Sequence, residues 1–375
     1  MFVKKIRLKN YRGYDELELG FDKGINILSG DNAQGKTNLL EAVYYCSSGR
    51  SHRTTKDKEC IYLGREEALI KIVFERSAGR EEQIEIHLKQ NGKKSLAING
   101  YPARRINDLF GRLHVVLFSP EDLSLIKRGP AERRKFIDME ICQVDPVYLY
   151  DLQQYYKVLR QRNQLLKDAS KDRNYPTYAE KLNAVKETLF AWDAQLVSYG
   201  VKVMKRRDSF VSHLQEYTSK IHRTISHETE EMKLSYLNSV PMEEDQFLEI
   251  LEKDIEQDLR YGMTSSGPQH DDLIILINGT DIRKYGSQGQ QRTAALSLKL
   301  SELSMMREEI GESPVLLLDD VMSELDENRQ KQLAEYVKDH QTIMTCTGVE
   351  DSIRLLPVGA HFHVKAGKVT EVVDE

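Results

Sequence analysis

The sequence has few cysteines, no long apolar run and no secretory segment, and each absence excludes a class of protein. Its four cysteines, at positions 46, 60, 142 and 346, lack CxxC spacing. We therefore expect neither a zinc site nor a disulfide framework, as suits a reducing cytoplasm. No apolar run approaches the roughly 20 residues that a membrane span needs, and the first residues alternate like a strand. We expect a cytoplasmic protein without a membrane partner.

Charge and apolar content are those of an ordinary folded protein. The net charge is −5 over 375 residues, of which 40% are hydrophobic and 30% charged. This composition is typical of globular chains rather than disordered ones. Because the overall charge is not positive, binding to nucleic acid must depend on local clusters of lysine and arginine. The length is sufficient for two domains with cores of their own.

Strand and helix patterns divide the chain into three stretches. β-type runs dominate residues 1–118, helical periodicity dominates residues 131–262, and mixed patterns return from residue 263. We predict one α/β nucleotide-binding domain, formed by residues 1–130 and 263–375, with a helical domain of residues 131–262 inserted in it. The predicted strands are 3–8, 25–28, 68–74, 83–88, 95–98, 115–118, 273–277, 315–318 and 342–346, and the predicted helices are 36–46, 152–166, 182–203, 247–259, 288–307 and 327–339.

Residues 30–37, Gly-Asp-Asn-Ala-Gln-Gly-Lys-Thr, fit the phosphate-binding pattern GxxxxGK[ST]. A predicted strand precedes them and a helix follows, which is the context of a P-loop rather than of a chance match in a turn. Lys36 is predicted to place a point charge beside the β- and γ-phosphates, and Thr37 to offer a hydroxyl to Mg²⁺. The backbone that curls around the phosphates belongs to Gly30, Asp31, Asn32, Ala33, Gln34 and Gly35.

The predicted strand 315–318 ends in two acids, Asp319 and Asp320. Carboxylates at the carboxyl edge of a parallel sheet lie where α/β proteins bind ligands. Asp319 is predicted to hold Mg²⁺, and Asp320 to orient or deprotonate the attacking water as the catalytic base. Most ABC-type ATPases have glutamate at the second position, so the shorter Asp320 predicts slow hydrolysis. A simple alternative is that both acids cap a helix.

Residues 285–292, Tyr-Gly-Ser-Gln-Gly-Gln-Gln-Arg, have the form of an ABC signature motif. In ABC-type dimers this segment, here with Ser287 and Gly289, caps the γ-phosphate that the other subunit binds. Alone it could be a surface loop that starts a helix. Together with the P-loop and the acidic strand end, it predicts an ATP-dependent homodimer. Residues 323–326 have the spacing of a D-loop, and Thr345 stands where many ABC ATPases have a switch histidine.

Arg50, Arg53 and Lys56 follow the predicted P-loop helix and are our candidates for contact with DNA. Further basic clusters lie at residues 104–105, 127–135 and 202–207. Most short basic clusters are solvated faces. Several on one face bind a phosphate backbone, with an affinity that falls steeply with salt.

Motifs spread over the whole chain resemble the RecF family of bacterial recombination mediators, which are SMC/Rad50-like ABC ATPases. The paired Asp319 and Asp320 are usual in that family, whereas Ala33 stands where the family commonly has glycine. The resemblance adds Arg12 to the nucleotide-binding residues. It also puts Glu121 or Asp122 in place of the usual Q-loop glutamine, with Glu121 near the metal. The resembling segments are 8–12, 34–42, 49–53, 118–123, 133–138, 285–292 and 316–321.

The resemblance implies an ABC-type ATPase head with mixed sheets and a weak, DNA-dependent ATPase activity that uses ATP and Mg²⁺. Such a protein dimerises on ATP and binds DNA at single-strand gaps, at junctions of single- and double-stranded DNA, and on duplex DNA. It works with RecR, and indirectly with RecO, to load RecA in DNA repair, replication and the SOS response.

Three other functions fit parts of the sequence. An ABC transporter subunit usually has a Q-loop glutamine, glutamate after the strand aspartate and a switch histidine, and this sequence has other residues at those positions. A Rad50-like nuclease partner needs a long coiled coil and usually a Cys-x-x-Cys hook. A DNA-binding scaffold that uses ATP only to dimerise carries the same motifs, and measurement of multiple-turnover ATPase activity separates it from an enzyme.

Overall fold

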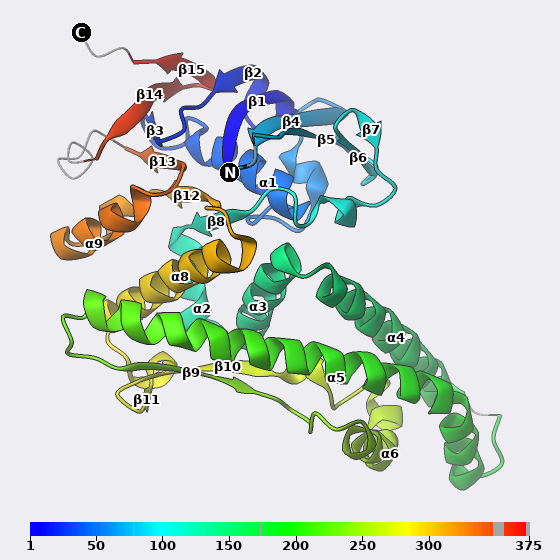
Figure 1. Ribbon diagram of the computed structural model, residues 1–375. Coiled ribbons are helices and arrows are strands. Elements are labelled where there is room, and N and C mark those ends of the chain that lie inside the picture. The colour runs from blue at the N-terminus through cyan, green and yellow to red at the C-terminus, as the bar shows by residue number, and fades with distance from the viewer. Residues whose placement is uncertain (78, 173, 348–355, 373–375) are drawn as a thin grey trace. The chain divides into compact units, whose positions relative to one another are not determined.

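The computed structural model describes residues 1–77, 79–172, 174–347 and 356–372. Contacts between residues divide the chain into two units, each built from separate stretches of sequence (Figure 1). The first unit comprises Met1–Ile126, Lys220–Glu230 and Ser287–Glu375, and the second comprises Lys127–Ser219 and Glu231–Gly286.

A largely parallel six-stranded sheet in the first unit joins both ends of the chain (Figure 1). Four of its strands, predicted from their apolar runs, are confirmed, and they are buried along their whole length because both faces of the sheet are covered. Only β15 runs antiparallel to its neighbour. The order is β15 (Lys368–Glu371), β14 (Val358–Lys365), β3 (Ile25–Ser29), β13 (Thr342–Cys346), β12 (Val315–Asp319) and β8 (Val115–Phe118).

An antiparallel sheet forms the other layer of the first unit. Its long strands alternate buried and exposed residues, as expected of a sheet with one face on the core. Helix α1 (Lys36–Ser48) contacts strands of both sheets, and its apolar residues share one core with them. The strand order is β2 (Tyr14–Gly20), β1 (Phe2–Tyr11), β4 (Glu67–Glu75), β5 (Glu81–Lys89), β6 (Lys94–Ile98) and β7 (Tyr101–Pro102).

The helices confirm the predicted patterns, and α5 extends well beyond its predicted range to 48 residues. Three helices, α2, α3 and α7, have no counterpart among the predicted ranges, although α3 lies almost wholly in the stretch predicted to be helical. Among the described residues, no helix combines the length and the apolar character needed to cross a membrane. The helices after α1 are α2 (Leu123–Lys127), α3 (Pro130–Val144), α4 (Pro146–Lys171), α5 (Tyr178–Ile225), α6 (Glu244–Tyr261), α7 (Ile282–Tyr285), α8 (Gln288–Ile310) and α9 (Glu327–Val337).

The boundaries of the two units differ from the predicted insert, 131–262. Residues 263–286 belong to the second unit, because β10 (Asp272–Ile277) pairs with β9 (Met232–Leu237) and β11 (Thr280–Asp281) in an antiparallel sheet there. The apolar run of β10 resembles that of a parallel core strand, and only its pairing tells the two apart. Residues 220–230 return to the first unit.

A buried arginine, Arg207 on α5, ties together segments of the second unit. Its guanidinium donates to both carboxylate oxygens of Asp138, at 2.8 and 2.9 Å, and to the carbonyl of Pro268 at 2.8 Å. It also lies 3.5 Å from the carboxylate of Asp271. The side chain is 1% exposed, so its charge depends on these partners rather than on water.

Replacing Arg207 should destabilise the second unit strongly. Arg207→Met leaves Asp138 and Asp271 without their counter-charge, and we expect a loss of about 3–5 kcal/mol in the free energy of unfolding. The neighbouring Arg206 is 55% exposed and pairs with Asp145 at 3.1 Å. Arg206→Met, the matched control, should therefore cost less than about 1 kcal/mol. Urea unfolding followed by the fluorescence of Trp192, the single tryptophan and a residue of this unit, measures both. Similar losses in the two variants would contradict the prediction.

Candidate functional site

Three neighbouring strands of the parallel sheet bring the predicted nucleotide-binding segments to one edge. Asp319 at the end of β12 is in register with Thr345 on β13, and Cys346 on β13 is in register with Ser29 on β3. Because the strands are parallel, their carboxyl ends meet at the same edge. The P-loop follows β3 directly, and its last residue, Thr37, reaches across β13 to the carboxylate of Asp319 at the end of β12.

The P-loop wraps around the ammonium group of its own lysine. The Nζ atom of Lys36 donates to the carbonyl oxygens of Gly30 and Asp31, and the side chain is 6% exposed. Gly30 has φ 144°, and a Cβ there would lie 2.3 Å from the carbonyl oxygen of Val364. Only glycine fits this position. The loop leads into the N-terminus of α1, whose free N–H groups and dipole favour an anion.

The tip of the loop is braced by the turn between β14 and β15. The side-chain oxygen of Gln34 accepts from the backbone N–H of Ala366 at 2.7 Å, and its carbonyl accepts from Gly367 at 3.2 Å. Ala33 has φ 64°, in the left-handed region. An alanine in this conformation costs about 1 kcal/mol or more relative to glycine. The glycine that resembling sequences commonly have at this position would remove that strain.

The carboxylate of Asp319 accepts hydrogen bonds from hydroxyl groups on two elements, α1 and β13. One of its carboxylate oxygens accepts from Thr37 at 2.8 Å and from Thr345 at 2.9 Å, and the hydroxyl of Thr345 accepts from the backbone N–H of Asp320 at 2.9 Å. A carboxylate and a hydroxyl side by side are oxygen ligands of the kind that Mg²⁺ prefers, and Mg²⁺ takes its remaining ligands from water and phosphate. The residues therefore fit the predicted metal. Asp320 has φ 53°, a strained conformation of the kind that functional sites retain.

Arg12 lies behind the P-loop, paired with a buried acid that the sequence patterns did not indicate. Its guanidinium donates to both carboxylate oxygens of Glu41, at 2.8 and 2.6 Å, and to the carbonyl of Glu59. Burial would raise the pKa of Glu41, but hydrogen bonds from Arg12 and Ser51 lower it instead. The sequence could have indicated Glu41 as a residue near the site, because it follows Thr37 by four residues and therefore lies on the same face of the helix. A contact between Arg12 and nucleotide stays a prediction.

The three candidate DNA-binding residues differ in how free they are. Arg53 donates to the side-chain oxygen of Asn38 at 3.0 Å and lies 3.8 Å from Glu41, so it also supports α1. Lys56 is 66% exposed and 3.7 Å from Glu59. Arg50 is exposed. Their role in DNA binding stays a prediction, and Arg50 and Lys56 test it more cleanly than Arg53 does.

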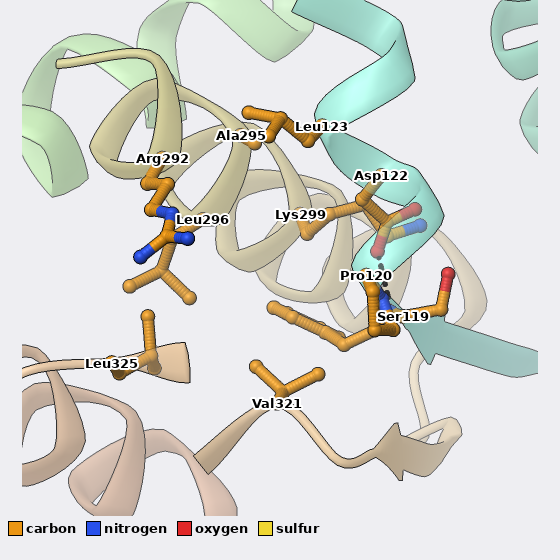
Figure 2. A pocket seen from close by; sticks show the side chains of 11 residues that line it. Ser119, Pro120, Asp122, Leu123, Arg292, Ala295, Leu296, Lys299, Val321 and Leu325 are labelled. Carbon is orange, nitrogen blue, oxygen red and sulfur yellow. Dashed lines mark hydrogen bonds between the residues drawn. The ribbon is translucent and has the colours of Figure 1, made fainter. Parts of the chain in front are cut away.

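The two acids of the predicted Q-loop, Glu121 and Asp122, lie in different environments. Glu121 is exposed, and its part in holding a metal stays a prediction. Asp122 accepts from the backbone N–H of Ser119 at 2.7 Å, and burial raises its pKa to about 6, although nearby Lys299 lowers it. Figure 2 shows Asp122 and Lys299 lining a cavity of about 50 Å³. This cavity has room for water but not for a nucleotide.

The signature motif caps α8. The hydroxyl of Ser287 accepts from the backbone N–H of Gln290 at 3.2 Å, and the side-chain oxygen of Gln290 accepts from the N–H of Ser287 at 2.9 Å. Arg329 on α9 donates to Thr293 at 3.0 Å and to the carbonyl of Gly289 at 3.4 Å. Ser287 and Gly289 line a polar cavity of about 350 Å³, whose other residues come from 225–230, 290–293 and 326–329.

The structure therefore divides the predicted site residues into two groups within the first unit. The P-loop, Asp319 and Asp320 gather at the edge of the parallel sheet. Ser287 and Gly289 face a cavity whose lining comes from the turn after α5, the start of α8 and the start of α9. Each group has features of half a phosphate site: a lysine and oxygen ligands in one, a helix N-terminus and a serine hydroxyl in the other.

Comparisons with known proteins show the family to which the chain belongs. The family model described as RecF/RecN/SMC N terminal domain matches residues 2–350. The chain is 48% identical over 377 residues to the DNA replication and repair protein RecF of Agathobacter rectalis, with 100% of both chains covered. It is 37% identical to a solved recombination mediator protein RecF with ATP in the RecFOR pathway, with TM-score 0.90 over 99% of this chain and 98% of that one.

A more distant likeness supports the fold alone. The Smc head domain of Pyrococcus furiosus, solved with an extended coiled coil and bound to part of ScpA, is 17% identical to this chain with TM-score 0.57. The match covers 99% of this chain and 96% of that one. The fold is that of an SMC-type ABC ATPase head with mixed α/β sheets.

Asp122 should make stability depend on pH. A carboxyl whose pKa is raised in the folded state opposes folding when it is ionised, so the cost is present above pH 6 and disappears as the pH falls toward 4. Asp122→Asn keeps an oxygen acceptor for Ser119 and removes the charge. We expect it to raise the free energy of unfolding by about 1–3 kcal/mol at neutral pH and by little in acid.

Urea unfolding of the Asp122→Asn variant, followed by far-ultraviolet circular dichroism over a series of pH values, measures this difference. Glu121→Gln is the matched control, because that neighbouring carboxylate is exposed. Its effect on stability should be small at every pH. An Asp122→Asn difference that stays constant with pH would contradict the prediction.

Proposed function

The chain belongs to the RecF family of DNA replication and repair proteins, and from that premise we propose that it is an ATP-gated homodimer that mediates recombination on DNA. It binds single-strand gaps, junctions of single- and double-stranded DNA, and duplex DNA. It acts in the cytoplasm with RecR, and indirectly with RecO, to load RecA during repair, replication and SOS induction. Its turnover is that of a weak, DNA-dependent ATPase.

The separation of the two half-sites carries this proposal. One chain has a P-loop with its oxygen cluster at the sheet edge, and a signature serine at a different cavity of the same unit. In an ABC-type dimer, Ser287 of each protomer completes the ATP site of the other. Two identical composite sites follow from a two-fold arrangement of copies. The partnership with RecR and RecO rests on relatives of this chain that act in the RecFOR pathway.

The chain's own residues divide the chemistry among them. Lys36 and the P-loop N–H groups bind the phosphates, and a helix N-terminus lies behind them. Thr37 and Asp319 would hold Mg²⁺, which supplies positive charge beside the β- and γ-phosphates when it is bound. Thr345 fixes Asp319 by donating to it and holds the backbone of Asp320 by accepting from it. Asp320 orients the attacking water or takes its proton. Its side chain is shorter than the usual glutamate, and slow turnover follows.

Mixtures of two inactive variants test the composite site. Lys36→Ala removes the charge on the phosphates and should abolish ATP binding. Ser287→Arg should leave ATP binding by the monomer within about twofold of normal but block dimerisation and hydrolysis, because it places bulk and charge on the partner's γ-phosphate. A mixed dimer has one site with both defects and one intact site, so mixing should recover part of the ATPase activity.

Two measurements check this expectation. ATPase activity is measured over a series of mixing ratios, and mixed dimers are detected by affinity tags that differ between the variants. Activity in unmixed Ser287→Arg protein would exclude a role of Ser287 in trans. Absence of recovery in dimers shown to be mixed would argue against sites shared between subunits.

DNA binding should depend on ATP and on exposed basic residues. Arg50→Ala with Lys56→Ala should weaken binding to gapped DNA and make the logarithm of affinity fall less steeply with the logarithm of salt, by about one unit of slope for each phosphate that the protein no longer neutralises. Affinity for ATP should not change. Fluorescence anisotropy with labelled gapped DNA, with and without ATP, measures both effects. Lys89→Ala with Lys93→Ala, which removes two exposed lysines at the turn after β5, is the control. Normal DNA affinity in the Arg50 and Lys56 variant would show that the DNA surface lies elsewhere.

A further inference from the structure

A chain of hydrogen bonds leads from the last turn of α5 to the signature serine, all within the first unit. The buried imidazole of His222 contacts the carboxylate of Glu230 through Nε2 at 3.3 Å. The other oxygen of that carboxylate accepts from the side-chain amide of Gln290 at 2.8 Å. The oxygen of the same amide accepts from the backbone N–H of Ser287 at 2.9 Å. The four residues therefore form one continuous connection.

The carboxylate of Glu230 determines which group donates and which accepts in each of these hydrogen bonds. An ionised carboxylate only accepts, so it selects the NH₂ group of Gln290 and turns the amide oxygen toward Ser287. For the same reason Nε2 of His222 must be the donor. The remaining ring nitrogen of His222 lies 2.9 Å from the hydroxyl of Ser297, which is on α8 itself. Glu230 is thus held between α5 and α8, and it fixes an amide that has two possible orientations.

The orientation of this amide bears on the phosphate site. With Gln290 fixed, the N–H of Ser287 is occupied, and the serine oxygen accepts the backbone N–H of Gln290. The hydroxyl proton of Ser287 is then available to donate. Glu230 and Ser287 line the same cavity. The carboxylate therefore stands beside the space where a partner's phosphate would enter, and it acts on the serine through one intervening side chain.

We propose that Glu230, itself held by His222, is a positioning residue for the composite ATP site: it sets the amide of Gln290 and thereby the hydroxyl of Ser287 that meets the partner's γ-phosphate. This role rests on the proposed two-subunit site. It assigns a function to residues 220–230, which belong to the first unit although the stretches on both sides of them belong to the second.

Substitutions at Glu230 separate positioning from ATP binding. Glu230→Ala should leave ATP binding by the monomer unchanged and reduce ATP-driven dimerisation and turnover about tenfold, since a hydrogen bond to a charged group is removed. Glu230→Gln keeps an acceptor for the amide of Gln290 and should restore most of the loss. Glu228→Ala is the matched control, because this carboxylate in the same loop is exposed. A loss of ATP affinity in Glu230→Ala, or an equal defect in Glu228→Ala, would overturn the proposal.

Mixed dimers test in which site Glu230 acts. Paired with Lys36→Ala, a Glu230→Ala subunit contributes an intact P-loop to one intact composite site, so activity should rise above that of Glu230→Ala alone. When a Glu230→Ala subunit is paired with a Ser287→Arg subunit, the signature motif is defective in both composite sites, so activity should not rise. A purely structural defect would make the two pairings behave alike, and that result overturns the positioning role.

The reference mixture of Ser287→Arg with Lys36→Ala distinguishes failure of the positioning role of Glu230 from failure of the composite site itself. If this mixture recovers activity and the mixture of Glu230→Ala with Lys36→Ala does not, the positioning role alone is overturned. If the reference mixture fails as well, the composite site fails, and the role of Glu230 fails with it.

Discussion

The rest of the site depends on two hydrogen bonds, which the carboxylate of Asp319 accepts from the hydroxyl groups of Thr37 and Thr345. They join the end of β12, the first turn of α1 and the end of β13, which are contributed by both halves of the chain. A parallel sheet makes this possible, because all its strands finish at one edge. The hydroxyl of Thr345 also accepts from the backbone N–H of Asp320, so the residues proposed to hold the metal and to act as the base are positioned by the sheet rather than by a flexible loop.

Burial of α1 between two sheets requires compensation for its polar groups. Glu41 is fully buried on this helix, and Arg12 at the end of β1 pairs with it through two hydrogen bonds. Removing either partner would leave an uncompensated charge in the core, which costs several kcal/mol. The pair therefore fixes the antiparallel sheet to the helix that carries the P-loop. In the same way Arg207 fixes separate segments of the second unit.

Under the proposed function, Ser287 serves both the folding of α8 and the composite ATP site. As the first residue of a capping box it satisfies free N–H groups at the start of α8. The same arrangement directs its hydroxyl toward the cavity that Glu230 and Arg329 also line. The cap and the phosphate contact are thus compatible rather than alternative, since the serine oxygen accepts within the helix while its proton is left for a ligand.

The sequence by itself determined what neighbouring residues decide: the P-loop with its strand and helix, the buried strands of the parallel sheet, and the helix that starts at Ser287. Each depends on local backbone geometry and on a period of apolar residues within one segment. Tertiary structure alone decided which distant segments meet. Nothing local pairs Arg12 with Glu41 or Glu230 with Gln290, and the apolar run of β10 joins the second unit only because β9 offers it an edge. Apolar periodicity specifies which face of an element is buried, whereas the partner on that face is chosen by packing over the whole chain.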